Sequence, residues 1–379
     1  MQYAVAARVR GVGLRHAAGI LCIAAVGGCW MIPPPAGLMD PTVRRIGCEP
    51  GSCGGAENQV EVTYLGTSGI LIRYRGASLL TAPFFSKPVL KRVVLSMLPL
   101  GRNSGFRMEP DTALIERFLP ATADNASAIL VGHGHYDHLL DVPYIANHRA
   151  RSARIYGGPS VRHTLMGDSA LRLDGGSRLI AIPVSQTGSR DRAAEWIYTE
   201  DRRFRFMPLA ATHAPTIKRL GVSYLFAEGR LLKDLKSLPG SASGWKLGEP
   251  YAFLIDVLAP GDTTPHFRIY HQDAPSSPPH GFPPSAVLRE RPVDLAVICA
   301  PTSTYLRDVP DSLLKILAPP SVMVTHWESL FRRGTLSVQF NTASDIDNFI
   351  ERVRRGLPAD ARWAMPVPQA VMNFRTTAD

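Results

Sequence analysis

The feature that most constrains this chain is the stretch ILVGHGHYDHLLDV, residues 129–142. It places His133, His135 and His138 and the carboxylate of Asp137 within six positions, although all 379 residues include only 11 histidines. The apolar run before the cluster is typical of a buried strand, so we expect the following loop at one edge of a sheet. Nothing apolar explains this spacing, and the pattern favours a metal site over surface or core histidines.

The spacing within the cluster predicts more than one set of metal ligands. Residues two apart in an extended chain point the same way, which pairs His133 with His135. Asp137 and His138 come where a turn begins, so their side chains point in different directions. One short loop can therefore serve two metal ions, and imidazole and carboxylate groups suit Zn²⁺.

Apolar segments around this cluster predict a layered α/β protein, because strand-like runs alternate with helical ones. Residues 60–83 form two β-rich runs around Arg75-Gly76, which is a hairpin pattern. Helices are expected at 111–119, capped by Asp111, and at 344–356, with Ser344 as its cap and Gly356 as its stop. Further strands are expected at 179–184, 204–210, 251–257, 267–271, 294–300 and 321–325.

The H-x-H-x-D-H motif after an apolar strand resembles the signature of the metallo-β-lactamase superfamily. VTYLGTSGILI followed by LLTAPFFSKP is similar to the opening hairpin of that family. Three more family positions follow in order: His213 in PLAATHAP, Asp273 in FRIYHQDA and His326 in VMVTHWESL. The order, and the His before Trp, look most like the branch that contains N-acyl-phosphatidylethanolamine phospholipase D and the sugar-lactone hydrolases. The resemblance covers about residues 60–330 and implies a four-layered αββα sandwich.

The resemblance also implies a role for each residue of the site. His133, His135 and His213 would hold a first zinc ion, and Asp137, His138 and His326 a second. Asp273 would bridge the two ions, and other divalent metals are compatible with such a site. A hydroxide between the metals would attack a carbonyl carbon or a phosphorus atom. Asp137 would also orient this hydroxide or pass a proton to the leaving group, so Asp137 and Asp273 are the expected catalytic residues.

Asp262 in PGDTTPH is a rival for the bridging position, because its G-D-T matches the family motif better. However, residues 251–257 and 267–271 form a plausible hairpin that places Asp262 in the turn and Asp273 at the open end. Strands of about six residues separate these ends by roughly 20 Å. We expect Asp273 at the metals, since it follows a strand end as His213 and His326 do.

Departures from the family pattern weaken the expectation of turnover more than that of metal binding. Ala82 stands where the family has an Asp after the first hairpin, and Thr67 stands where it has a histidine. Loss of such a supporting residue typically costs about 10–100-fold in affinity or activity. His271 is expected beside Asp273, His163 on a helix surface, and Glu328 in solvent.

The N-terminus has the order of a secretory signal, with Arg8, Arg10 and Arg15 followed by a ten-residue apolar run that is too short to span a bilayer. VGGC resembles the lipobox of bacterial lipoproteins, which implies a signal over 1–28 and a lipid on Cys29. An ordinary cleaved signal with an incidental cysteine is the alternative. We expect a Pro/Gly-rich tether over 29–58 and a hydrolase domain over 59–379 with an insertion at 84–126.

The remaining cysteines fit an oxidising compartment. Cys48 and Cys53 flank a tight loop and could pair there, although zinc is a rival for two close cysteines. Cys299 lies in a strand-like run and is expected as a free core thiol. The predicted location is the bacterial cell envelope, lipid-anchored and facing the periplasm.

The formal net charge of +10 allows attraction to anionic surfaces or substrates. No dense Lys/Arg run is interleaved with aromatic residues, so nucleic acid is not an expected partner. Three functions remain open: hydrolysis of phosphodiesters or phospholipids, hydrolysis of lactones or amides, and metal binding in the envelope with little catalysis. The apolar segment 89–100 is either a lipid-facing lip or a helix that packs on the core. The sequence predicts no oligomeric state.

Overall fold

Apolar residues from position 60 onward build three antiparallel strands in the computed structural model: β1 (Gln59–Gly66), β2 (Gly69–Tyr74) and β3 (Ala77–Thr81). The turn at Arg75-Gly76 lies where the sequence predicts it. A second turn, at Thr67-Ser68, breaks the first expected run in two. Thr67 adopts a positive φ of 54° in this turn. The structure describes residues 46–48, 55–98, 105–214, 227–331 and 345–376.

The described strands form two mixed sheets of seven strands each. In the first sheet the order is β14-β1-β2-β3-β4-β5-β6, and β3 to β6 run parallel. In the second it is β13-β12-β11-β10-β9-β8-β7, and β10 to β13 run parallel. The bounds of the other strands are β4 Ala126–Leu130, β5 Arg154–Gly157, β6 Leu179–Ala181, β7 Ile197–Tyr198, β8 Phe204–Ala210, β9 Tyr251–Leu258, β10 Pro265–Gln272, β11 Leu295–Cys299, β12 Ser321–Thr325, β13 Arg362–Ala364 and β14 Val371–Arg375.

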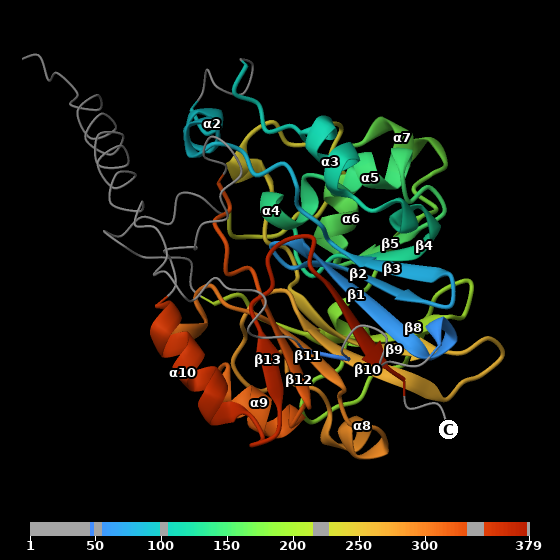
Figure 1. Ribbon diagram of the computed structural model, residues 1–379. Coiled ribbons are helices and arrows are strands. Elements are labelled where there is room, and N and C mark those ends of the chain that lie inside the picture. The colour runs from blue at the N-terminus through green and yellow to red at the C-terminus, as the bar shows by residue number, and fades with distance from the viewer. Residues whose placement is uncertain (1–45, 49–54, 99–104, 215–226, 332–344, 377–379) are drawn as a thin grey trace, which may run out of the picture. The chain divides into compact units, whose positions relative to one another are not determined.

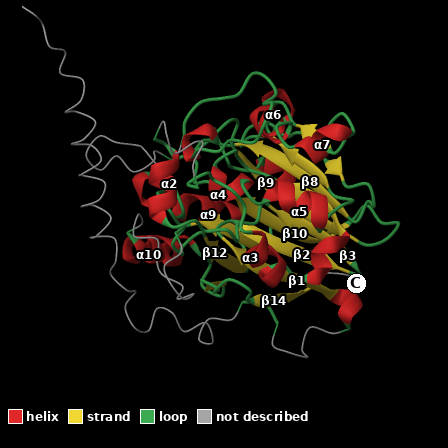
Figure 2. Ribbon diagram, turned by 90° about the horizontal axis from the view of Figure 1, so that it is seen from above, coloured by secondary structure: helices red, strands yellow, loops and turns green. Residues whose placement is uncertain are grey.

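Helices cover the outer faces of both sheets (Figure 1). Figure 2 shows the strands in the middle, with helices around them. The α-helices are α2 Leu90–Ser96, α3 Thr112–Phe118, α4 Tyr136–Leu139, α5 Val142–His148, α6 Pro159–Leu165, α7 Ser169–Leu173, α8 Ser285–Glu290, α9 Asp311–Leu317 and α10 Ile346–Gly356. Short 3₁₀ turns lie at η1 Ala56–Asn58, η3 Ala121–Asn125, η4 Val184–Gln186, η5 Ala242–Gly244 and η6 Ser303–Tyr305.

The two-residue period of the strands divides the core into layers. In β2, Ile70 and Ile72 join the apolar cluster between the sheets, which includes Phe253 and Val297 of the second sheet. Leu71 faces the other way, into a cluster with helix residues such as Ile145 of α5. The αββα sandwich expected from the sequence is confirmed.

The expected helices are present, with one change at an end. Asp111 caps α3 by accepting a hydrogen bond from the backbone N–H of Leu114. The cap of α10 is Asp345 rather than Ser344, because its carboxylate accepts the N–H of Asn348. In the expected insertion, α2 buries Val93 and Ser96, which agrees with a helix that packs on the core.

The signal region with Cys29, and Cys53, lie outside the described residues. Cys48 is disulfide-bonded, and Cys299 is the buried free thiol that the sequence predicts. Among the helices in the described part of the chain, none is long and apolar enough to cross a bilayer.

Candidate metal centre

Four strand ends bring the predicted site residues to one edge of the sandwich. β8 and β10 both pair antiparallel with β9, so they run in the same direction, as does β12. The carboxyl ends of these strands therefore share an edge, which is where α/β proteins commonly place ligands. His213 follows β8, Asp273 follows β10 and His326 follows β12.

The fourth strand, β4, delivers the histidine loop from the first sheet. Gly134 holds this loop against the segment before β9, because its N–H donates to the carbonyl oxygen of Leu247 at 2.9 Å. The loop then enters the short helix α4, which carries Asp137 and His138. Thus both sheets contribute side chains to the same site.

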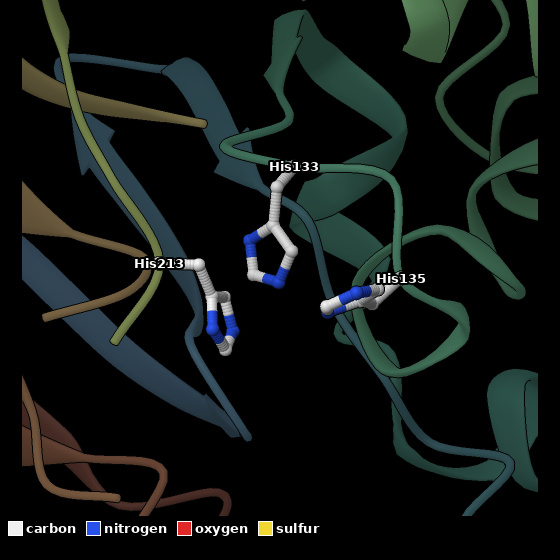
Figure 3. A group of neighbouring side chains, drawn as sticks. All are labelled: His133, His135 and His213. Atoms are coloured by element: carbon white, nitrogen blue, oxygen red, sulfur yellow. The ribbon is translucent and has the colours of Figure 1, made fainter. Parts of the chain in front are cut away.

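His133, His135 and His213 form the first group of possible metal ligands. One ligand atom from each residue lies within 4.8 Å of the others. The ring centroids of His133 and His135 are 4.8 Å apart, and each lies 5.1 Å from the centroid of His213. Figure 3 shows the three imidazoles turned toward a common point, His133 and His135 from one loop and His213 from another.

Asp137, His138 and His326 form the second group, and all three are buried. Oδ2 of Asp137 lies 3.4 Å from Nε2 of His138 and 3.3 Å from Nε2 of His326. The carboxylate of Asp137 therefore lies between the two imidazoles. This agrees with the prediction that Asp137 and His138 belong to a second set of ligands.

Asp273 joins the two groups. Its Oδ2 lies 2.8 Å from Nδ1 of His133, and its Oδ1 lies 2.9 Å from Nδ1 of His138. Asp262, the rival, lies in the turn between β9 and β10, where its Oδ2 is 3.0 Å from Nε2 of His266. The structure thus brings together all seven predicted ligands, with Asp273 in the bridging place.

Unsatisfied polar atoms show that a cation fits this cluster. Three buried atoms in it have no hydrogen-bond partner within the described part of the chain: Nε2 of His133, Oδ1 of Asp137 and Nδ1 of His326. Each buried polar atom without a partner costs about 1–3 kcal/mol. Several such atoms in one place need a common partner, and the imidazole and carboxylate donors match the preference of Zn²⁺ and related divalent metals.

Electrostatics keep most of these groups in the form that binds metal. Burial, with the nearby His138, lowers the pKa of His133 to about 4, so this ring is neutral at pH 7. Burial alone would raise the pKa of Asp137 and of Asp273, but the surrounding histidines hold both well below the ordinary value. Burial also opposes a charge on His138, yet Asp273 and Asp137 raise its pKa to about 10. A cation at His138 must therefore displace a proton.

Glu328 does not lie in solvent, and that prediction is wrong. Its carboxylate is buried and accepts hydrogen bonds from the N–H of Thr67 at 2.6 Å, from the hydroxyl of Tyr64, and from Nζ of Lys87 at 3.1 Å. No local pattern could reveal this, because Tyr64 and Thr67 are more than 260 positions away in sequence.

Two other expectations agree with the structure. His271 lies beside the site, with Nε2 2.8 Å from the carbonyl oxygen of Ser68, whose own hydroxyl donates to the carbonyl of Asp273. His163 lies on α6, with Nδ1 2.6 Å from Oδ1 of Asp234.

A buried carboxylate near Ala82 was not anticipated from the sequence. Ala82 is buried, and its N–H donates to the carbonyl oxygen of Leu130. The N–H groups of Phe85 and Ser86, which follow Ala82 closely in sequence, donate hydrogen bonds to the carboxylate of Asp141. Asp141 thus ties the segment after β3 to the end of the histidine motif.

Comparisons with known proteins give distant structural likenesses. No family model matches the chain, and no curated protein matches it. Among solved structures, the metallo hydrolase Igni18 from the archaeon Ignicoccus hospitalis has a TM-score of 0.43 at 13% identity, over 84% of this chain and 99% of that one. The diiron β-hydroxylase CmlA from Streptomyces venezuelae has a TM-score of 0.42 at 15% identity, over 85% of this chain and 54% of that one. An isothiocyanate hydrolase from Delia radicum gut bacteria has a TM-score of 0.42 at 14% identity, over 83% and 99%. At such identities and scores these likenesses assign no chemistry to this chain.

Proposed function

We propose that this chain is a metal-dependent hydrolase whose centre takes two zinc ions. His133, His135 and His213 would hold one ion, and Asp137, His138 and His326 the other, with Asp273 shared between them. The observation that carries this proposal is the convergence of seven nitrogen and oxygen donors from four strand ends, with unsatisfied buried atoms among them. Another divalent metal with the same ligand preference would fit the same donors.

Two such ions, when bound, supply Lewis acidity toward a carbonyl or phosphoryl oxygen and make bound water acidic. The chain's own residues then set orientation and proton transfer. Asp273 contacts His133 and His138, so it fixes the spacing of the two ligand groups. Oδ1 of Asp137 is buried and has no hydrogen-bond partner among the described residues, which suits this carboxylate oxygen to accept a hydrogen bond that orients the attacking water.

Phosphodiesters, including phospholipids, are the substrate class that we propose. Two-metal centres stabilise both the attacking and the leaving oxygen in displacement at phosphorus. The net charge of +10 favours the approach of an anionic substrate. Lactones and amides are the alternative class, because the same centre can polarise a carbonyl group.

A substrate panel tests this proposal. Zinc-loaded protein would be assayed with bis-p-nitrophenyl phosphate, phospholipid vesicles, a homoserine lactone and a chromogenic β-lactam. We expect phosphodiester cleavage that is lost in His135→Ala. If only the lactone or the β-lactam is cleaved, the substrates are lactones or amides and the phosphodiester proposal is wrong. A protein that binds two zinc ions and turns over none of the four would instead be a metal-binding envelope protein.

We also propose that the chain is held at the cell envelope by a lipid on Cys29. The support is the order of charged, apolar and small residues before that cysteine. In Cys29→Ser we expect the protein to move from the membrane fraction to the soluble fraction. If Cys29→Ser stays in the membrane fraction, the lipid anchor on Cys29 is wrong and the segment is an ordinary signal.

A further inference from the structure

The backbone of His326 has an unusual conformation for a residue in a ligand position. His326 follows β12 directly and has a φ of +59°, in the left-handed region that residues with a side chain rarely adopt. Its N–H donates to the carbonyl oxygen of Thr67 at 2.7 Å. Thr67 lies in the turn between β1 and β2 and itself has a φ of +54°. Two such residues in contact persist only where their surroundings over-determine them.

Glu328 supplies those surroundings. Its Oε1 accepts the N–H of Thr67 at 2.6 Å and lies 3.1 Å from Nζ of Lys87, while its Oε2 accepts the hydroxyl of Tyr64. Tyr64 Oη lies in turn 3.1 Å from the backbone nitrogen of His326. Glu328 and Tyr64 are at most 1% exposed, so these bonds form away from water.

The charge state of this group strengthens its bonds. The Lys87 ammonium lies 3.1 Å from Oε1 of Glu328, so a positive charge accompanies the hydrogen bonds that this carboxylate accepts from Tyr64 and Thr67. Hydrogen bonds to an ionised carboxylate are roughly twice as strong as neutral ones.

The bonds join the two sheets at one residue of the site. Tyr64 and Thr67 belong to the first sheet and its turn, whereas His326 and Glu328 follow β12 of the second sheet. His135 and His213 come from other elements, the loop after β4 and the segment after β8. Of the seven proposed ligands, it is the backbone of His326 that these hydrogen bonds hold.

We propose that Glu328 is a positioning residue: through Thr67 and Tyr64 it holds the His326 backbone in its left-handed conformation and so sets the affinity of the second metal position. The proposal rests on the metal centre proposed above. Because the direction of an imidazole follows its backbone, release of this conformation turns the ring of His326 away from Asp137. The first metal position keeps all of its ligands.

Stepwise zinc binding tests this role. The metal-free full chain would be titrated with Zn²⁺ against a chromophoric chelator, and with Co²⁺ followed by its visible absorption. Glu328→Gln keeps the size of the side chain but loses its charge and one acceptor. We expect the second equivalent to bind about 10–100-fold more weakly and the first to bind as in the wild type, since supporting groups of metal ligands have effects of this size. Tyr64→Phe should weaken the second equivalent in the same way, to a smaller extent.

Asp256→Asn is the matched control, because it changes another fully buried carboxylate. Asp256 pairs with Arg268 and Arg205. It lies about 17 Å along β9 from Tyr251, whose N–H bonds to Gly132 beside the metal loop. We expect this variant to unfold at a lower temperature and to bind both equivalents as the wild type does.

The outcomes separate the two proposals. If the wild type binds two ions and Glu328→Gln binds both with unchanged affinity, or loses both equally, the positioning role is wrong and the metal centre stands. If the wild type binds no metal, the metal centre itself is wrong, and the positioning role with it. If Glu328→Gln does not fold, Tyr64→Phe provides the test: the positioning role requires weaker binding of the second zinc ion and unchanged binding of the first.

Discussion

Gly132 lies so close to Asp273 that a Cβ atom at residue 132 would stand 2.2 Å from Oδ2 of that carboxylate. Real Cβ atoms essentially never approach another heavy atom so closely. The glycine before the histidine cluster is therefore required by Asp273, which follows strand β10 of the other sheet. This relationship joins the cluster to Asp273 without involving any ligand side chain of the loop.

Gly132→Ala should therefore damage the metal centre although it removes no ligand. The added methyl group displaces the Asp273 carboxylate from Nδ1 of His133 and of His138. We expect zinc affinity to fall at least about 10-fold, the lower end of the effect of disturbed supporting groups. A chelator competition assay measures this. In Gly105→Ala, where the added Cβ meets nothing within 4 Å, the affinity should not change.

Substitutions of Asp273 and of Asp262 should have different effects on metal binding. Asp273→Ala removes a carboxylate that contacts both ligand groups, so we expect loss of at least one zinc ion per chain. Asp262→Ala removes a turn residue that pairs with His266, so the zinc content should stay at the wild-type value. Bound zinc after gel filtration is the readout. The reverse result would assign the bridging role to Asp262.

Asp141 should make stability depend on pH. Burial raises its pKa from 3.8 to about 6, so the folded state holds this proton more tightly than the unfolded state. Stability from this group is therefore full below about pH 4 and falls by about 3 kcal/mol as the pH rises to about 6. Asp141→Asn cannot ionise, so its stability relative to the wild type should improve across this window. Urea unfolding of metal-free protein at several pH values would show this; parallel pH curves for the two proteins would refute it.

The buried ion pair between Arg268 and Asp256 should matter far more than a surface pair. Arg268→Met leaves a fully buried carboxylate with only Arg205, and breaking a buried pair costs about 3–5 kcal/mol. Arg73→Met breaks the partly exposed pair with Glu61 and should cost about 0–1 kcal/mol. Denaturant midpoints measure both. Equal effects of the two changes would contradict this ranking.

Local pattern was enough to predict most of the fold. The strands at 204–210 and 321–325 have the predicted bounds, because both segments are mostly apolar. The turn at Thr67 was missed, since a threonine with positive φ has no signature in sequence. It is held by groups distant along the chain, above all by Glu328.

The residues of the site also fall into those that the sequence reveals and those that only the fold reveals. The histidine cluster could be found because four of its members lie within six positions. The other three candidate ligands could be found because each follows the end of a predicted strand. Glu328 and Asp141 were missed, because their meaning depends on burial and on partners that only the folded chain brings near. Short-range spacing thus predicts ligands better than it predicts the residues that support them.

The zinc content of the purified chain tests the central claim most directly. After loading with zinc and gel filtration, elemental analysis should give two ions per chain for the wild type. His326→Ala should keep one ion, since only the second ligand group loses a member. A wild-type protein without zinc, or a His326→Ala variant that carries as much zinc as the wild type, would contradict the account.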